Sequence, residues 1–156
     1  MKKAKVGWFS FTCCEDSTIV FTELMNTHYD EWKKIINIQA ARILRKKENL
    51  KDLDISFVEG AIASERDAEK LREIRKNSKI LVAVGACACE GMPSSQRNKF
   101  NESQRNEIQA EVKRFNLLKE TLPIKKFVKV DEYIEGCPMG EQDFLKTLDK
   151  CVKKVR

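Results

Sequence analysis

Six cysteines are the residues of this sequence best suited to chemistry. They occur as an adjacent pair, a pair one residue apart and two single residues: Cys13 and Cys14, Cys87 and Cys89, Cys137, and Cys151. Thiolate sulfur is a soft ligand that binds zinc and iron–sulfur clusters, whereas buried thiols are chemically inert. The sequence has a single histidine, His28, so any metal site in this chain has to rely on sulfur.

The spacing of the cysteines separates these possibilities. Structural zinc sites commonly take cysteine pairs separated by about two to four residues. The adjacent pair at 13–14 and the pair at 87 and 89 do not have that spacing. An iron–sulfur cluster can instead take its thiolates from dispersed loops. The spacing therefore favours an iron–sulfur cluster, and zinc or thiols without any metal remain as alternatives.

The elements that must position these thiols follow from the hydrophobic pattern. Apolar runs predict strands over residues 6–11, 54–58, 79–84 and 127–130. Helical spacing and capping signals predict helices over residues 17 to about 47, 64 to about 77, 102–115 and 140–154, with a loop over residues 85–98. Strands alternating with helices indicate βαβ units, a mainly parallel central sheet with helices on both faces, and a single α/β domain over residues 1–156.

Five of the cysteines fall in loops that follow predicted strands. The adjacent pair follows the first strand, the pair at 87 and 89 follows the third, and Cys137 follows the fourth. The carboxyl ends of parallel strands meet at one edge of the sheet, where open α/β sheets bind ligands. We therefore expect these loops to converge on one rim, where Gly85 and Gly136 would let a bulky group approach. Cys151 lies in the last predicted helix near Leu148 and is expected in the core.

Composition narrows the classes of function. The chain has 156 residues, 42% hydrophobic, with a net charge of +6. Its lysines and arginines alternate with acidic residues, which is typical of a solvated surface and predicts no nucleic-acid partner. No apolar run approaches the ~18 residues of a membrane span, and the run at 6–11 is too short for a signal peptide. We expect no membrane insertion and a cytoplasmic location, where cysteines serve metal or redox chemistry more often than disulfides.

Four short motifs occur in an order that resembles a known family. They are the cysteine pair after the first strand, Val58-Glu59-Gly60, Gly85-Ala86-Cys87-Ala88 and Gly136-Cys137-Pro138. In this order, over residues 6–144, the chain resembles the small subunits of nickel–iron hydrogenases and equally the related cluster-bearing subunit of NADH:quinone oxidoreductase. The stretch 91–98 is similar to the post-cysteine loop of cytosolic hydrogenases that couple to soluble carriers, which favours the hydrogenase side.

The resemblance implies a cofactor and its ligands. The family holds a proximal 4Fe-4S cluster with two cysteines of a C-x-x-C motif after the first strand, one of a G-x-C loop and one of a G-C-P loop. Cys87 and Cys137 match the last two, and Cys14 matches the first cysteine of C-x-x-C. The second falls on Ser17, and serine is a poor cluster ligand. Because the respiratory relatives carry tandem cysteines at this place, Cys13 is the expected fourth ligand. Ser17, a partner residue, water or a degraded cluster remain as alternatives.

The resemblance also implies a fold, a function and partners. The fold would be flavodoxin-like. The chain would be a non-catalytic electron-transfer subunit with one cluster, since it ends at Arg156 before the further cluster region of larger relatives. Its partners would be a catalytic large subunit of hydrogenase type and a further iron–sulfur or flavin electron-transfer subunit. The alternatives are a quinone-oxidoreductase-type cluster subunit and a structural subunit without a cluster; the Ser17 departure supports the latter. Met139 also departs from the family, where many relatives have proline.

Two carboxylates are expected near the cluster. Glu15 and Glu59 follow or flank the first two predicted strands, and the resemblance suggests interface or proton-path roles for them. Hydrogen bonding to the loop backbones is the equally good alternative. Cys89 is expected to be a small loop or core residue, and His28 to pack or face solvent; a ligand role is the alternative for both. Trp8 and Trp32 are expected to be core or subunit-contact residues, with an electron path as the alternative.

Overall fold

The computed structural model describes residues 2–44 and 49–156. The strands within these residues are β1 (Ala4–Ser10), β2 (Ile36–Ala41), β3 (Leu53–Glu59), β4 (Ile62–Ser64), β5 (Ser78–Val84), β6 (Leu117–Leu122) and β7 (Glu132–Ile134). The α-helices are α1 (Asp16–Ile35), α2 (Glu65–Lys76), α3 (Gly85–Glu90), α4 (Glu102–Arg114) and α5 (Glu141–Val155). Two short 3-10 helices are η1 (Gln96–Lys99) and η2 (Ile124–Lys126).

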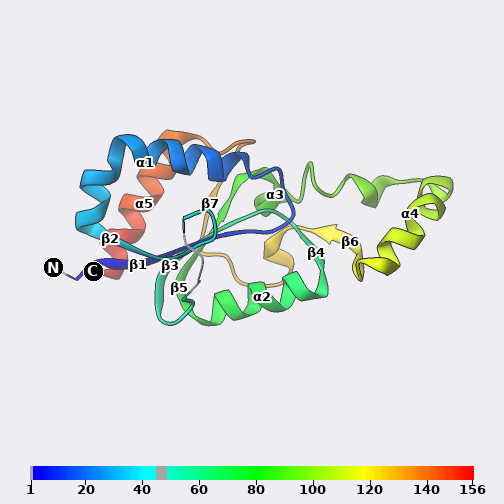
Figure 1. Cartoon of the computed structure of the whole chain (residues 1–156), viewed down its shortest axis with the longest axis horizontal. Coiled ribbons are helices and arrows are strands. Elements are labelled where there is room, and N and C mark those ends of the chain that lie inside the picture. The colour runs from blue at the N-terminus through cyan, green and yellow to red at the C-terminus, as the bar shows by residue number, and fades with distance from the viewer. Residues whose placement is uncertain (1, 45–48) are drawn as a thin grey trace.

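The centre of the molecule is a parallel sheet with strand order β2-β1-β3-β5-β7. Helices α1 and α5 lie on one face and α2 lies on the other (Figure 1). This arrangement confirms the expected α/β fold with helices on both faces. The strand order runs outward in both directions from β1 and β3, so the topological switch point lies between their carboxyl ends. That is the edge of the sheet that carries the loop with the adjacent cysteines.

Aromatic side chains fill the core between the sheet and the α1–α5 layer. Trp8 of β1 stacks on Phe21 of α1 with ring centroids 4.4 Å apart and 5° between the planes. Phe144 of α5 packs edge-on against both rings and against Trp32. His28 stacks on Trp32 at 5.7 Å. Both tryptophans are therefore core residues, as expected, and His28 packs at the periphery of this aromatic core. The stacking fixes α1 against β1 and so fixes where α1 begins.

The opposite face of the sheet is covered by α2. Its N-terminus is capped as the sequence predicts, because the Asp67 backbone N–H donates to Ser64 Oγ at 3.1 Å. Its apolar stripe packs on fully buried residues of β3 and β5: the stripe is Ala68, Leu71 and Ile74, and the sheet contributes Val58, Leu81 and Ala83. Burial on both faces explains why β3 and β5 read as continuous apolar runs.

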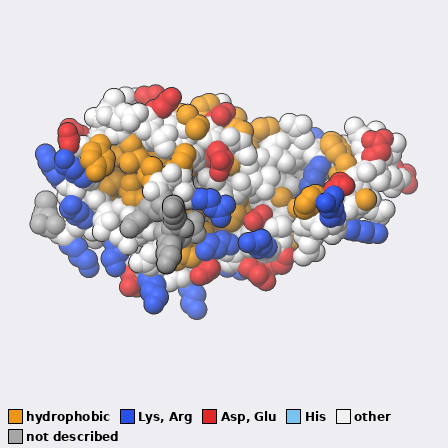
Figure 2. Space-filling view, in the orientation of Figure 1, with side chains coloured by type: hydrophobic (Ala, Val, Ile, Leu, Met, Phe, Trp, Pro, Cys, Tyr) orange, Lys and Arg blue, Asp and Glu red, His pale blue; other side chains and the backbone are white. Residues whose placement is uncertain are grey.

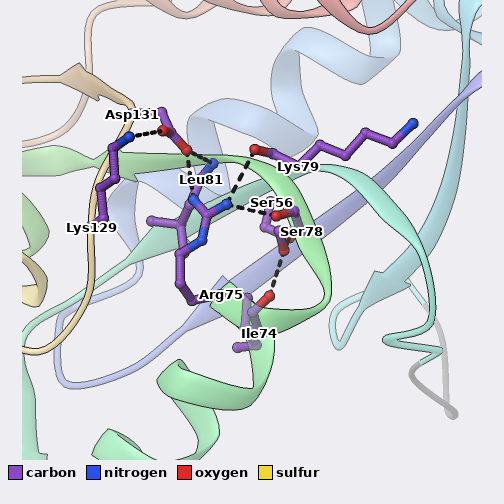
Figure 3. A network of polar contacts seen from close by, with 8 residues as sticks. All are labelled: Ser56, Ile74, Arg75, Ser78, Lys79, Leu81, Lys129 and Asp131. Atoms are coloured by element: carbon purple, nitrogen blue, oxygen red, sulfur yellow. Dashed lines mark hydrogen bonds and ion pairs between the residues drawn. The ribbon is translucent and has the colours of Figure 1, made fainter.

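The chain just before β7 is held by an ion pair with α2 and by hydrogen bonds with the neighbouring strand β5 (Figure 3). Arg75 Nη1 donates to Asp131 Oδ2 at 2.6 Å, and the same oxygen accepts from the Leu81 N–H at 2.9 Å. The Asp131 N–H in turn donates to the Leu81 carbonyl at 2.9 Å. Although burial works in the other direction, the Leu81 N–H and Arg75 hold the pKa of Asp131 below its usual value. These contacts set the position of β7 and of the Cys137 loop that follows it.

One expected helix is wrong in its second half. Residues 36–41, predicted as helix, form β2 beside β1. Ile35, Ile38 and Ala41 fit helical spacing, but Ile36, Ile38 and Ala40 also alternate as in a strand. Pairing with β1 decides between the two patterns, because tertiary context outweighs local propensity. The expected end of this helix, near residue 47, lies outside the described residues.

Two further expectations about elements are wrong. Residues 127–130 are not a strand, and the edge strand of the sheet is β7 at Glu132–Ile134. The backbone N–H groups of Phe127 and Val128 donate to the Ile124 carbonyl, at 3.0 and 3.2 Å, so they are not available for a strand ladder. Their side chains pack against the core between the sheet and α2. Residues 85–98, expected as loop, contain α3 and the first three residues of η1, Gln96–Lys99. The Ala- and Cys-rich stretch after β5 can form a short helix because its small side chains lose little conformational entropy there.

The surface carries mixed charge. On the face shown in Figure 2, lysine and arginine side chains are interspersed with aspartate and glutamate. Helix α4 projects away from the central sheet, and the strand that follows it, β6, pairs antiparallel with β4 (Figure 1). None of the helices in the described part of the chain is long and apolar enough to cross a bilayer.

Candidate functional site

The loop after β1 is held to the loop after β3. Thr12 and Ala61 exchange two backbone hydrogen bonds, with N–H to O distances of 3.0 and 2.9 Å. Gly60 makes this approach possible: its φ is 93°, and a Cβ there would lie 2.9 Å from Thr12 N. Cys13 follows directly and is therefore presented at the carboxyl ends of β1 and β3. The glycine of the Val-Glu-Gly motif thus lets the backbone after β3 hydrogen-bond to the loop that carries Cys13 and Cys14.

Glu59 caps helix α1. Its Oε1 accepts from the Ser17 N–H at 2.9 Å and its Oε2 accepts from Thr18 Oγ1 at 2.6 Å. The residue before the helix, Glu15, has a φ of 64° and makes no side-chain cap of its own. Burial of Glu59, which is 3% exposed, raises its pKa. Of the two roles left open for Glu59, hydrogen bonding to the loop backbone is the one seen in this structure.

Ser17 joins the three cysteine-bearing loops. Its Oγ accepts from the Met139 N–H at 3.1 Å, in the loop after β7. A Cβ on Gly85, at the start of α3, would lie 3.0 Å from the same oxygen. The Ala86 N–H donates to the Gly136 carbonyl at 2.7 Å, which links α3 to the Cys137 loop directly. The expected convergence of these loops on one rim is confirmed.

The thiols at this rim interact electrostatically. Burial raises the pKa of Cys13 to about 12, and the charges of Glu59 and Cys87 act in the same direction. Cys87 is buried in α3, whereas Cys14 and Cys137 are exposed. The Asp16 backbone N–H favours the Cys14 thiolate, but desolvation, Asp16 itself and Cys137 outweigh it and raise the pKa of Cys14. The rim therefore has an inner pair, Cys13 and Cys87, and an outer pair, Cys14 and Cys137.

The other two cysteines are directed elsewhere. Cys89 is fully buried, and its Sγ lies 3.6 Å from the Ile134 carbonyl and 3.8 Å from the Ala83 carbonyl, in the sheet. Cys151 is buried between α5 and the sheet. Burial raises the pKa of both thiols to about 11. Both are core residues, as expected.

The donor set at the rim fits an iron–sulfur cluster better than a single ion. Across residues 2–44 and 49–156, no three His, Cys, Asp or Glu side chains are placed to hold one metal ion together. The thiols come from three loops, with Cys13 close enough to Cys87, and Cys14 to Cys137, for their charges to interact. A cubane takes one thiolate on each of its irons, so its ligands stand further apart than those of a mononuclear site.

Two residues at the rim were not assigned their roles from the sequence. Ser17 was considered only as a substitute ligand, and Ser94 was not singled out. Ser94 Oγ lies 3.1 Å from Cys87 Sγ and 2.8 Å from the Thr12 carbonyl. The sequence did show a serine in the turn that follows the Cys87 motif. The direction of its hydroxyl, however, depends on how that turn packs against the other loops.

Comparisons with known proteins give the family. The family model described as NADH ubiquinone oxidoreductase, 20 Kd subunit, matches residues 13–151. The chain belongs to this family.

Three similar proteins carry hydrogenase names. The chain is 30% identical to a subunit of the F420-non-reducing hydrogenase vhu of Methanocaldococcus jannaschii, over 86% of this chain and 51% of the relative. It is 27% identical to a Pyrococcus furiosus sulfhydrogenase 2 subunit delta, over 97% and 63%. The crystal structure of an NAD+-reducing nickel–iron hydrogenase contains a chain with a TM-score of 0.85 and 26% identity, covering 98% of this chain and 93% of that one. The resemblance to hydrogenase small subunits is thus confirmed, although the chain spans only about half to two thirds of the two curated relatives.

Proposed function

We propose that this chain is the electron-transfer small subunit of a hydrogenase-type complex and that it binds one 4Fe-4S cluster at the rim. The ligands would be Cys13, Cys14, Cys87 and Cys137. The observation that carries the proposal is the meeting of three cysteine-bearing loops around Ser17. It brings Cys13 close to Cys87 and Cys14 close to Cys137, and it leaves Cys89 and Cys151 in the core. When bound, such a cluster supplies one-electron redox chemistry.

The contacts of Ser17 support Cys13 as the fourth ligand. The Ser17 hydroxyl oxygen already accepts from the Met139 N–H and faces Gly85. Turning it toward a metal would leave that buried N–H without a partner, which costs about 1–3 kcal/mol. Cys13, by contrast, lies close enough to Cys87 for their charges to interact. Burial raises the pKa of the Cys13 thiol to about 12, and a bound metal would displace that proton.

The exposure of the outer pair supports a partner at this face. Cys14 and Cys137 are exposed, so a cluster bound to them would lie at the surface of this chain. Exclusion of water lowers the local dielectric and so helps to set the potential of a redox centre. A catalytic large subunit docked on the rim would provide that cover and would exchange electrons over a short path. A further iron–sulfur or flavin subunit would continue the chain of carriers.

A second candidate is a cluster subunit of quinone-oxidoreductase type. The family description, NADH ubiquinone oxidoreductase 20 Kd subunit, supports it. The hydrogenase names of the curated relatives and the TM-score of 0.85 to a chain of an NAD+-reducing hydrogenase support the first candidate. Both candidates place the same cofactor at the same rim and differ in the partner.

The test is to produce the chain without oxygen together with the products of neighbouring genes. Iron and acid-labile sulfide are quantified, and the reduced sample is examined by EPR. We expect about four irons per chain and an EPR signal of a reduced cubane. Absence of iron would disprove the cluster. Reduction of the cluster by H2 within the complex identifies the hydrogenase type, whereas reduction that requires NADH and is reversed by a quinone identifies the second candidate.

A further inference from the structure

The hydroxyl of Ser94 lies between two of the cysteine-bearing loops. Its Oγ is 3.1 Å from Cys87 Sγ, in α3, and 2.8 Å from the carbonyl of Thr12, in the loop after β1. A serine hydroxyl has one hydrogen and rotates to suit its acceptors. It can therefore donate to the carbonyl or to the sulfur, and a thiolate sulfur is the stronger acceptor because it is charged.

The turn that carries Ser94 is held firmly. The Ser95 N–H donates to the Gly91 carbonyl at 2.8 Å, which closes the turn behind Ser94. Just beyond it, the Arg97 guanidinium donates to the Leu118 carbonyl at 2.7 Å and to Thr121 Oγ1 at 3.0 Å. Because both ends of the turn are anchored, the hydroxyl is placed beside Cys87 by the fold and not by a freely moving loop.

We propose that Ser94 is a positioning residue that donates a hydrogen bond to the Cys87 thiolate and raises the reduction potential of the cluster bound there. The inference rests on the proposed function, since it takes Cys87 as a ligand. A hydrogen bond to a ligand sulfur withdraws electron density from the cluster. The reduced cluster carries one more negative charge, so it gains more from the bond than the oxidised cluster does.

The neighbouring serine offers a matched control. Ser95 Oγ lies 3.1 Å from Met92 Sδ, in the same turn, and its hydroxyl is directed to that thioether. Ser94→Ala and Ser95→Ala therefore each remove one hydroxyl from the same turn, but only the first removes a donor to a cysteine. Ser94→Thr keeps the hydroxyl and tests whether the donor itself is responsible.

The experiment is an EPR-monitored redox titration of the complex purified with its co-expressed partners. We expect the midpoint potential of Ser94→Ala to shift to a more negative value than that of the wild type. The midpoint potentials of Ser95→Ala and Ser94→Thr are expected to equal that of the wild type. Equal midpoints for Ser94→Ala and Ser95→Ala, with about four irons per chain in each, would overturn the role of Ser94 and leave the proposed function intact.

A second measurement covers the case in which Ser94→Ala does not retain its cluster. Resonance Raman spectra of the wild-type complex in H2O and D2O report on exchangeable hydrogen bonds to the iron–thiolate units. We expect the iron–thiolate stretching bands to shift in D2O, and to shift less in any Ser94→Ala fraction that holds iron. Bands unchanged by D2O would overturn the proposal. A wild-type complex without iron would overturn the proposed function together with it.

Discussion

Ser17 Oγ accepts a hydrogen bond from the backbone N–H of Met139, 122 residues further along the chain, at a distance of 3.1 Å. This contact ties the N-terminus of α1 to the loop that carries Cys137. Both residues depart from the pattern of the family that the motifs resemble. By the resemblance to hydrogenase small subunits, Ser17 stands where the second cysteine of C-x-x-C would fall, and Met139 where many relatives would have proline, which has no N–H to donate. The two departures are therefore coupled in this chain by one hydrogen bond.

Replacing Ser17 by alanine should weaken the fold without removing a cluster ligand. The buried Met139 N–H would lose its acceptor, which lowers the free energy of unfolding by about 1–3 kcal/mol. Denaturant unfolding of the chain measures this loss. The iron content of Ser17→Ala should equal that of the wild type, whereas Cys13→Ala should lose iron. The reverse result, with iron lost from Ser17→Ala and kept in Cys13→Ala, would identify Ser17 as the ligand.

The four rim cysteines should differ from the two core cysteines in their effect on iron. Alanine at Cys87 or Cys137 is expected to reduce iron well below four per chain and to change or abolish the EPR signal. Cys89→Ala and Cys151→Ala serve as controls. They are expected to keep the iron and to cost about 1 kcal/mol of stability through the small cavities they leave. Retention of full iron in Cys137→Ala would rule out the assigned ligand set.

Alkylation of the cluster-free chain should follow exposure and thiol pKa. Cys14 and Cys137 are exposed and should react first with iodoacetamide, as followed by mass spectrometry of peptides. Cys89 and Cys151 should lag, because burial hides them and raises the pKa of each thiol to about 11.

The pH dependence of this reaction has a defined sign. Raising the pKa disfavours the thiolate, so at any pH below about 11 these two thiols are mostly protonated. Their rates should increase about tenfold for each pH unit up to that value. In denaturant all six cysteines should react alike, which is the control for accessibility. Early labelling of Cys89 in the folded chain would contradict its placement against the sheet.

Asparagine at Asp131 should destabilise the chain at neutral pH. The change removes the charge that pairs with Arg75 in a partly buried site, and a loss of about 1–3 kcal/mol is expected. Asp149→Asn, which breaks an exposed pair with Lys153, should change stability by no more than about 1 kcal/mol. Denaturant unfolding at pH 7 compares the two variants.

The effect of Asp131→Asn should fade in acid. The folded-state pKa of Asp131 lies below its unfolded value, so its contribution is complete above the unfolded pKa of about 3.9. That contribution is lost as the pH falls through the lower, folded-state pKa. The stability difference between wild type and variant should therefore shrink below about pH 4. A difference that is the same at pH 3 and pH 7 would exclude a charge-based role.

Several features of this protein were determined by the sequence alone. Strands β1, β3 and β5 are short apolar runs buried on both faces, and such runs can be recognised without knowing their neighbours. Five of the six cysteines follow β1 or β5 directly or stand in the Gly-Cys-Pro loop. The rule that parallel strands end at one edge then brought the loops together. The position of Cys151 in the core also followed from local pattern, since it lies at helical spacing from Leu148.

The tertiary structure alone decided the rest. Residues 36–41 fit both a helix and a strand, and only the vacant edge of β1 made them β2. Residues 127–130 have strand-like composition, but β7 is the strand that pairs with β5. The hydrogen bonds of Asp131 with Leu81 and Arg75 place the chain so that pairing begins after Asp131. The roles of Ser17 and Ser94 depend on partners far away in the sequence, Met139 and Thr12. A hydroxyl contributes one short, directional bond, so its partner is known only once distant segments have been placed within about 3 Å of each other.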